Sequence, residues 1–249
     1  MALDEAYLHK IIPKPGSLPN VKSDASRAFE VLKAGGVVIA PTEVGYGLLA
    51  SSTEAVQKAF AAKKRKPGHA QGVIGTYQLH RELHLLDEKR FEITRVLTHD
   101  LDMSFGVVAP FRADHPRLRQ LTPETLANCT KNDTLGMFVG GGSFLFELGR
   151  LNDDDGQIML GSSANISGQG QKFRVEDIED EIKEAADLIV DYGLQRYYTY
   201  GRASINFDFG NMKVLRMGSC YELFRERMAK FWGVELPEDP DYKTSSKEE

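Results

Sequence analysis

The chain has 249 residues, of which 41% are hydrophobic and 27% are charged, so it is long enough to bury a core without disulfides. Its two cysteines, Cys129 and Cys220, lie far apart and outside any C-x-x-C motif, which argues against a disulfide scaffold or a thiolate zinc site. We therefore expect the protein to reside in the reducing cytoplasm. No apolar run reaches the roughly 20 residues that span a bilayer, and no signal peptide or membrane contact is expected. The net charge of −5 argues against a surface devoted wholly to nucleic acid.

Apolar periodicity, β-branched runs and glycine or proline breaks predict alternating helices and strands in the first part of the chain. Ser23 and Asp24 are typical of a helix N-cap, and Gly35 with Gly36 of a helix end. In chain order we expect an extended arm at 1–22, a helix from 23 to about 34, a buried strand at 37–40, a loop at 41–48 leading into a strand, a helix starting at 52–53 and broken at 67–68, a mostly helical segment at 78–101 and a strand at 103–109.

The second half continues the alternation. We expect strands at 135–139 and 158–160 with an acidic turn at 150–156 between them, a helix at 175–185, a strand at 188–191, a hairpin of 204–207 and 213–216, and a helix at 221–232. Residues 235–249 are polar and contain two prolines, which predicts a disordered tail. Because no repeat or linker interrupts the chain, we expect one domain over 23–234, an α/β sheet with helices packed on it.

Three polar loops, at 41–48, 63–72 and 161–168, follow predicted strands or helices. In open α/β sheets such loops gather at one edge and form the ligand crevice. Lysine and arginine can neutralise a polyanion there, serine and asparagine can hydrogen-bond it, and glycine lets the backbone approach. Each loop alone is more typical of an ordinary turn or a solvated helix end than of a ligand site. Together they predict a phosphate or nucleotide pocket, without the G-x-S-x-G elbow of a hydrolase or a Walker motif.

Four motifs occur in a characteristic order: PTE-x-x-YGL at 41–48, K-x-R at 63–65, SANISG at 163–168 and VLR-x-G at 214–218. In this order and spacing the chain resembles the Sua5/YrdC/YciO family from about Ser23 to Gly218. Its best-known members are L-threonylcarbamoyladenylate synthases. The resemblance implies a twisted, mixed, open sheet with flanking helices and a concave, basic cavity.

The resemblance also implies an activity. Bicarbonate and the amine of threonine would form a carbamate, which attacks the α-phosphate of ATP and expels pyrophosphate, with Mg²⁺ accompanying the nucleotide. The product would feed the N6-threonylcarbamoyl modification of an adenosine in tRNA. The implied partners are therefore a small-molecule amine, the tRNA-modification machinery and RNA. Positioning and charge stabilisation would dominate such a reaction, which agrees with the lack of a conspicuous acid–base pair.

Site residues follow from the resemblance by matching its motifs. Lys63 and Arg65 would grip the triphosphate, although Lys64 and Lys66 also partly fit the K-x-R pattern. No resident metal site is expected. The other residues implied around ATP are Ser163, Asn165, Thr134 and Arg216. The implied catalytic residues are Lys63, Arg65, Ser163 and Asn165. The implied acceptor-binding residues are Thr42, Tyr46 and Ser204.

The acceptor half departs from the family pattern. Phe138 stands where the family has an arginine for the threonine carboxylate, and Gly75 falls near a family histidine. We therefore hypothesise that the acceptor is not threonine, or that threonine is held differently. His69, Arg112 and His115 are candidate substitutes, although each is also typical of a surface side chain.

Two alternatives remain open. The first is a non-catalytic, nucleotide- or RNA-binding member of the family, as in YciO-like relatives; the acidic net charge speaks against broad RNA binding. The second is a different enzyme acting on a phosphorylated small molecule through acidic metal ligands. Asp153, Asp154 and Asp155 are the candidates for such ligands, although a run of aspartates in a turn is usually solvated.

Overall fold

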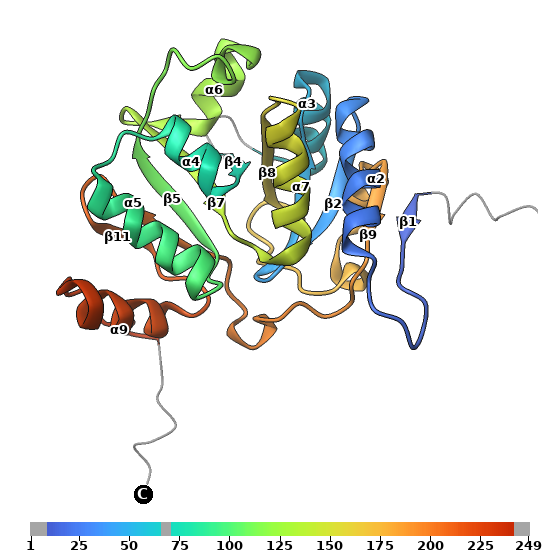
Figure 1. The fold of residues 1–249 in the computed structure, drawn as a ribbon. Coiled ribbons are helices and arrows are strands. Elements are labelled where there is room, and N and C mark those ends of the chain that lie inside the picture. Colours follow the sequence, from blue (N-terminus) through green and yellow to red (C-terminus); the bar gives the residue numbers. More distant parts are fainter. Residues whose placement is uncertain (1–8, 66–70, 242–249) are drawn as a thin grey trace, which may run out of the picture.

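The computed structural model describes residues 9–65 and 71–241, which form one mixed sheet of 11 strands flanked by helices (Figure 1). The expected α/β architecture is therefore confirmed. Across the sheet the order is β1-β9-β2-β3-β8-β4-β7-β5-β10-β11, and β6 pairs with β7. The strands are β1 (Lys10–Ile11), β2 (Val37–Thr42), β3 (Gly45–Ala50), β4 (Gly72–Gly75), β5 (Phe105–Pro110), β6 (Thr130–Lys131), β7 (Thr134–Val139), β8 (Met159–Ser163), β9 (Leu188–Val190), β10 (Ile205–Asp208) and β11 (Lys213–Arg216).

Polar side chains cap the N-termini of most of the helices. Ser52, Thr76, Asp87 and Thr122 each accept a hydrogen bond from the backbone N–H three residues on. No helix in the described ranges is long and apolar enough to cross a membrane. The helices are α2 (Val21–Lys33), α3 (Thr53–Ala62), α4 (Tyr77–Leu83), α5 (Glu88–Arg95), α6 (Pro123–Cys129), α7 (Gly142–Asp154), α8 (Asp180–Glu184) and α9 (Tyr221–Trp232).

The alternation of side chains along each strand gives the sheet two apolar faces. On one face Val38, Ala40 and Leu49 pack with the buried residues of α2 and α7, which lie side by side in Figure 1. On the other face the odd-numbered neighbours on β2, such as Val37 and Ile39, belong to the core that includes α3, α4, α5 and α9. The α2/α7 face is the one that carries the cavity described below.

Helix α7 is the main element that the sequence analysis missed. Gly140, Gly141 and Gly142 all have positive φ and make the sharp turn that starts it. Phe144, Leu145 and Leu148 follow at helical spacing and are buried among the residues of α2, although the glycine run and the aspartates suggest a turn. The acidic turn expected at 150–156 is therefore wrong, because residues up to Asp154 are helical.

Other boundaries also differ from expectation. Helix α2 starts at Val21, because Asn20, and not Ser23 or Asp24, accepts the capping bond. The expected loop at 41–48 is largely the tight β2–β3 hairpin. The segment 78–101 divides into α4, α5 and a π-helical turn, Val96–Asp100. The helix expected at 175–185 is a 3₁₀ turn, Val175–Asp177, followed by α8, because Ile178 is extended between them.

The described parts of the two chain ends also belong to the fold. In the predicted arm, β1 pairs in parallel with β9. In the predicted tail, Leu236 is buried, and the Tyr221 hydroxyl donates to the carbonyl of Pro237 at 2.7 Å. Leu236 and Pro237 therefore hold part of the predicted tail against the fold, and 242–249 lie outside the described residues.

A pair of buried histidines makes folding stability depend on pH. The Nδ1 atoms of His80 and His84 lie 2.6 Å apart, and His84 Nε2 lies 3.2 Å from the carbonyl oxygen of Leu135. Burial lowers the pKa of His84 to about 4, and burial followed by the charge of His84 lowers the pKa of His80 well below its usual value. Because the unfolded chain binds these protons more readily, stability is complete above the unfolded pKa, about 6.5, and falls with pH below it.

We expect the free energy of unfolding to fall below pH 6.5 by up to about 1.4 kcal/mol per pH unit for each histidine. Urea denaturation at pH 7 and pH 5 measures this loss. The His84→Gln variant should show a shallower pH dependence, whereas His99→Gln, at an exposed position, should keep the slope of the original chain. Equal slopes in all three proteins would contradict this role of the pair.

Candidate functional site

A cavity of about 700 Å³ lies over the middle of the sheet, and residues from β3, β8, β4, β7, β5 and β10 line it. Its lining includes the backbone of the central strands, the hairpin ends at Asn132 and Asn211, and one residue of α7, Leu145. The three polar loops expected to meet at one edge all contribute, through Thr42, Arg65 and Ser163 among others. The cavity is thus the place where the predicted motifs come together.

A row of glycines forms the cavity floor. Gly72 on β4 pairs with Gly161 on β8, and the pairing of Val73 with Met137 places Gly72 beside Gly136 on β7. A Cβ atom at Gly136 would have nothing within 4 Å, and one at Gly72 would meet only backbone oxygens at 3.8 and 4.0 Å. Among the described residues, the sheet backbone is therefore bare at Gly72 and Gly136, and a flat group can lie against it there.

Among the described residues, three cationic side chains line the cavity: Arg65, Lys131 and Arg216. Arg65 stacks on Phe60, with its guanidinium carbon 5.2 Å from the ring centre. Its buried Nη1 has no hydrogen-bond partner among the described residues, and burial lowers its pKa. A buried guanidinium N–H without an acceptor is costly, and an anionic ligand would supply the missing acceptor. Lys131, on the short strand β6, carries no motif and was missed by sequence reasoning.

Arg216 is held in place by Ser204 and by Asn206 on β10. Its Nε donates to the carbonyl of Ser204 at 2.9 Å, and its Nη2 donates to the Ser204 hydroxyl and to Asn206 Oδ1, both at 3.1 Å. The described carboxylate in the lining, Asp208, accepts hydrogen bonds from the backbone and side chain of Asn211. The cationic side chains thus outnumber the carboxylates along the described lining, which favours an anionic ligand.

Lys63 lies behind the cavity wall. Its side chain is 2% exposed, and its ammonium donates to the carbonyls of Ser163 and Asn165, to the latter at 2.6 Å. Burial, and secondarily Arg65, lowers its pKa to about 7. Its own carbonyl accepts from the N–H of Ser167, so Lys63 fastens both ends of the 163–167 loop. In the alternative register, Lys64 pairs at the surface with Glu181, and Lys66 lies outside the described residues.

The other expected nucleotide residues divide between the lining and the loop behind it. Ser163 and Thr134 line the cavity, and the Thr134 hydroxyl donates to the carbonyl of Lys131 at 2.6 Å. Asn165 is buried outside the lining. Its Nδ2 donates to the carbonyl of Ile166, and its Oδ1 has no partner among the described residues. Asn165 is therefore placed to shape the loop beside Ser163.

The expected acceptor residues line the cavity, but their hydroxyl groups have internal partners. Thr42 donates to the carbonyl of Gly45 at 2.6 Å within the β2–β3 hairpin. Tyr46 donates to the carbonyl of Gly193 at 2.8 Å and accepts from the N–H of Tyr192, and burial raises the pKa of its hydroxyl above the usual value. Ser204 accepts from Arg216. These hydroxyl groups therefore shape the cavity wall.

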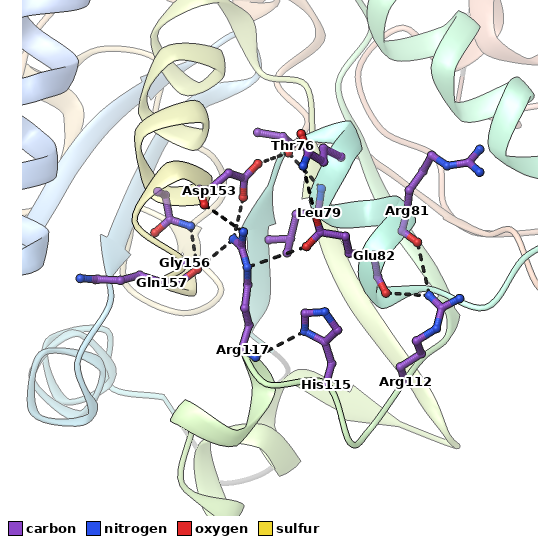
Figure 2. A network of polar contacts seen from close by, with 12 residues as sticks. Thr76, Leu79, Arg81, Glu82, Arg112, His115, Arg117, Asp153, Gly156 and Gln157 are labelled. Carbon is purple, nitrogen blue, oxygen red and sulfur yellow. Dashed lines mark hydrogen bonds and ion pairs between the residues drawn. The ribbon is translucent and has the colours of Figure 1, made fainter.

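The substitutes considered for the missing acceptor residues are not at the cavity. Arg112 donates to the carbonyls of Arg81, Glu82 and His84 and so braces the end of α4, whereas His115 accepts from the backbone N–H of Arg117 within its own loop (Figure 2). His69 lies outside the described residues. A side chain at Gly75 would collide with Met137, whose sulfur lies 2.6 Å from the Cβ position of Gly75. Met137, on the face of the sheet opposite the cavity, therefore fills the space where that side chain would lie.

The aspartate run is not a metal site. Asp153 binds Arg117 at 2.7 Å and accepts from the Thr76 hydroxyl (Figure 2). Asp154 pairs with Arg150 and Asp155 with Lys33, both at 2.6 Å. Across residues 9–65 and 71–241, no group of three or more His, Cys, Asp or Glu side chains is arranged to hold a metal ion. The metal-dependent alternative therefore lacks its proposed ligands.

The different surroundings of Lys63 and Arg65 predict different effects of the same substitution. Lys63→Met leaves the buried carbonyl of Asn165 without its donor, so we expect the free energy of unfolding to fall by about 1–3 kcal/mol. Arg65→Met removes a guanidinium whose Nη1 has no partner among the described residues but which stacks on Phe60, so the free energy of unfolding should fall by no more than about 1 kcal/mol. ATP affinity should fall about 10- to 100-fold in Arg65→Met.

Chemical denaturation and calorimetric titration with ATP measure the two effects on the same preparations. An unchanged free energy of unfolding in Lys63→Met, together with a loss of ATP affinity as large as in Arg65→Met, would show that Lys63 contacts the ligand directly.

The comparisons with known proteins agree with this architecture. The model of the Sua5/YciO/YrdC family, described as "Telomere recombination", matches residues 30–218. A hypothetical protein of Streptococcus mutans has a TM-score of 0.73 at 20% identity, covering 94% of this chain and 99% of its own. No curated protein matches the chain in sequence.

Two further structures cover longer proteins. Sua5 of P. abyssi, complexed with L-threonine, has a TM-score of 0.67 at 19% identity over 92% of this chain, which spans 61% of that Sua5. Full-length HypF, in a phosphate- and nucleotide-bound form, has a TM-score of 0.56 at 17% identity over 84% of this chain and 25% of its own. At these identities the similarities show a common fold. Because the family model matches most of its length, the chain belongs to the Sua5/YciO/YrdC family.

Proposed function

We propose that the chain binds ATP in the cavity and uses it to adenylate a carbamate formed from bicarbonate and an amine. The observation that carries the proposal is the buried N–H of Arg65, which has no partner among the described residues and belongs to the same cavity lining as the bare backbone of Gly72 and Gly136. The floor suits a flat base or sugar, and the guanidinium suits a phosphate oxygen. The nucleotide bound to HypF and the threonine bound to P. abyssi Sua5, both of this fold, are consistent with it.

The chemistry needs positioning more than proton transfer. A carbamate oxygen attacks the α-phosphorus, the bond to the β-phosphate oxygen breaks, and pyrophosphate leaves with the negative charge. Arg65 and Lys131 would stabilise that charge. Asp208, the carboxylate among the described lining residues, already accepts hydrogen bonds from Asn211. We therefore expect Mg²⁺ to arrive bound to the nucleotide and to neutralise its phosphate oxygens.

The place of the reaction in the cell follows from the proposed product. If threonine is the amine, the product is L-threonylcarbamoyl-AMP, and the tRNA-modification machinery of the cytoplasm is its consumer. Direct contact with RNA would then be needed only where the activated group is transferred.

One observation favours a second candidate, a binding protein without catalysis. The Lys63 ammonium and the hydroxyls of Thr42, Tyr46 and Ser204 have internal hydrogen-bond partners. A cavity with these groups already paired could bind a nucleotide or RNA and do no chemistry. Binding of ATP without release of pyrophosphate would support this candidate.

The test is release of pyrophosphate from ATP and bicarbonate, with and without amines including threonine. Gly136→Val places a branched side chain in open space at the floor, and valine suits a strand, so we expect a folded protein with at least a tenfold lower rate. Lys213→Val, at an exposed strand position outside the lining, is the matched control and should keep the original rate. An amine-dependent rate unaffected by Gly136→Val would place the chemistry elsewhere.

A further inference from the structure

A row of register neighbours crosses the cavity from β4 to β10. Gly72 on β4 lies beside Gly136 on β7. Gly136 pairs with Val108 on β5, and Val108 pairs with Asp208 on β10. All four residues line the cavity. Because neighbouring strands lie about 4.8 Å apart, Asp208 is about 10 Å from Gly136 across the sheet. The row therefore leads from the bare glycine floor to a carboxylate.

The cationic side chains Arg65 and Lys131 lie toward the other end of this row. Strand β5 pairs along the whole of β7, so β4 and β6 share the opposite edge of β7. Lys131 belongs to β6. Arg65 lies near Cys129, the residue before β6: burial raises the pKa of Cys129 to about 12, and the charge of Arg65 opposes that rise. Phosphates held by Arg65 and Lys131 would therefore lie on the β4 side of β7, whereas Asp208 lies on the far side of β5.

Asp208 is a buried carboxylate that can accept further hydrogen bonds. It is 9% exposed, and its two oxygens accept from the backbone N–H and the Nδ2 of Asn211, both at 2.9 Å. Within residues 9–65 and 71–241, no cationic side chain forms an ion pair with it. Each carboxylate oxygen has about two lone-pair sites, so each can accept one more bond. Such a group repels phosphate and attracts a neutral group that carries an N–H.

A nucleotide placed by these constraints brings its base to Asp208. With the phosphates on the β4 side, the sugar adjoins them and lies over the glycine floor. The base then lies over Val108, a half-buried apolar side chain that suits the face of a ring. The outer edge of the base meets Asp208. On adenine that edge carries the exocyclic amino group, whose N–H is a donor that a carboxylate can accept.

We propose that Asp208 recognises the base of the nucleotide by accepting a hydrogen bond from the exocyclic amino group of adenine. This inference rests on the proposed binding of ATP and specifies how the base is selected, whatever the amine acceptor is. Loss of a hydrogen bond to a charged group weakens binding by about 10- to 100-fold. We therefore expect ATP to bind tighter by that factor than purine riboside triphosphate, the same nucleotide without the amino group.

Calorimetric titration with Mg²⁺ and each of ATP, purine riboside triphosphate and 2′-deoxy-ATP measures this preference. Asp208→Asn keeps the size of the side chain and replaces one acceptor oxygen by a donor, so the preference for ATP over purine riboside triphosphate should fall at least fivefold. Asp154→Asn, at an exposed position outside the lining, is the matched control and should keep the original preference. Thermal denaturation checks that both variants are folded.

Equal affinities for ATP and purine riboside triphosphate in the original chain, or an unchanged preference in Asp208→Asn, would overturn the inference. A preference for ATP over 2′-deoxy-ATP that alone disappears in Asp208→Asn would place the ribose at Asp208 and would also overturn it. Failure of the proposed reaction gives a different result: ATP would bind with the expected preference, but no amine would support release of pyrophosphate. If none of the three nucleotides binds, both the inference and the proposed function are wrong.

Discussion

The register of the central strands is the constraint on which the site depends. Gly72 and Gly136 stand side by side on β4 and β7, so two neighbouring strands expose backbone to the same cavity. The next residues on β4 and β7, Val73 and Met137, are buried in the core on the opposite face. A slip of one residue in β4 would turn a valine into the cavity and a glycine into the core. The apolar packing that fixes the sheet thus also keeps the floor bare.

Two residues just after α3, Lys63 and Arg65, have different roles: one holds the site together and the other faces its ligand. Lys63 is 2% exposed, and its ammonium donates hydrogen bonds to carbonyls of the 163–167 loop. It therefore fixes the loop that carries Ser163. Arg65, two residues on, lines the cavity and keeps a buried N–H without a partner in the described chain. Because an unpaired buried donor costs free energy, Arg65 is the group that gains most from an anion. One short motif therefore both shapes the pocket and binds in it.

The motif loops and most strands were predictable, because local pattern determines them. The meeting of Thr42, Arg65 and Ser163 at one cavity agrees with the rule that the loops after strands and helices of an α/β sheet gather at one edge. Helix α7 was not predictable, because its glycine-rich start and acidic end resemble turns, and only burial against α2 shows it as a helix. Lys131 carries no motif, and the internal partners of Lys63 and Tyr46 depend on contacts more than 100 residues away in sequence.

The central claim is that a nucleotide lies on the bare glycine floor. Titration of the isotope-labelled protein with ATP and Mg²⁺, followed by the backbone amide resonances, tests it directly, because glycine amides are readily resolved. We predict that the resonances of Gly72 and Gly136 shift along one saturation curve, whereas Gly156, in a turn outside the lining, does not move. Saturable binding of ATP that leaves Gly72 and Gly136 unshifted, or no binding at all, would contradict the account.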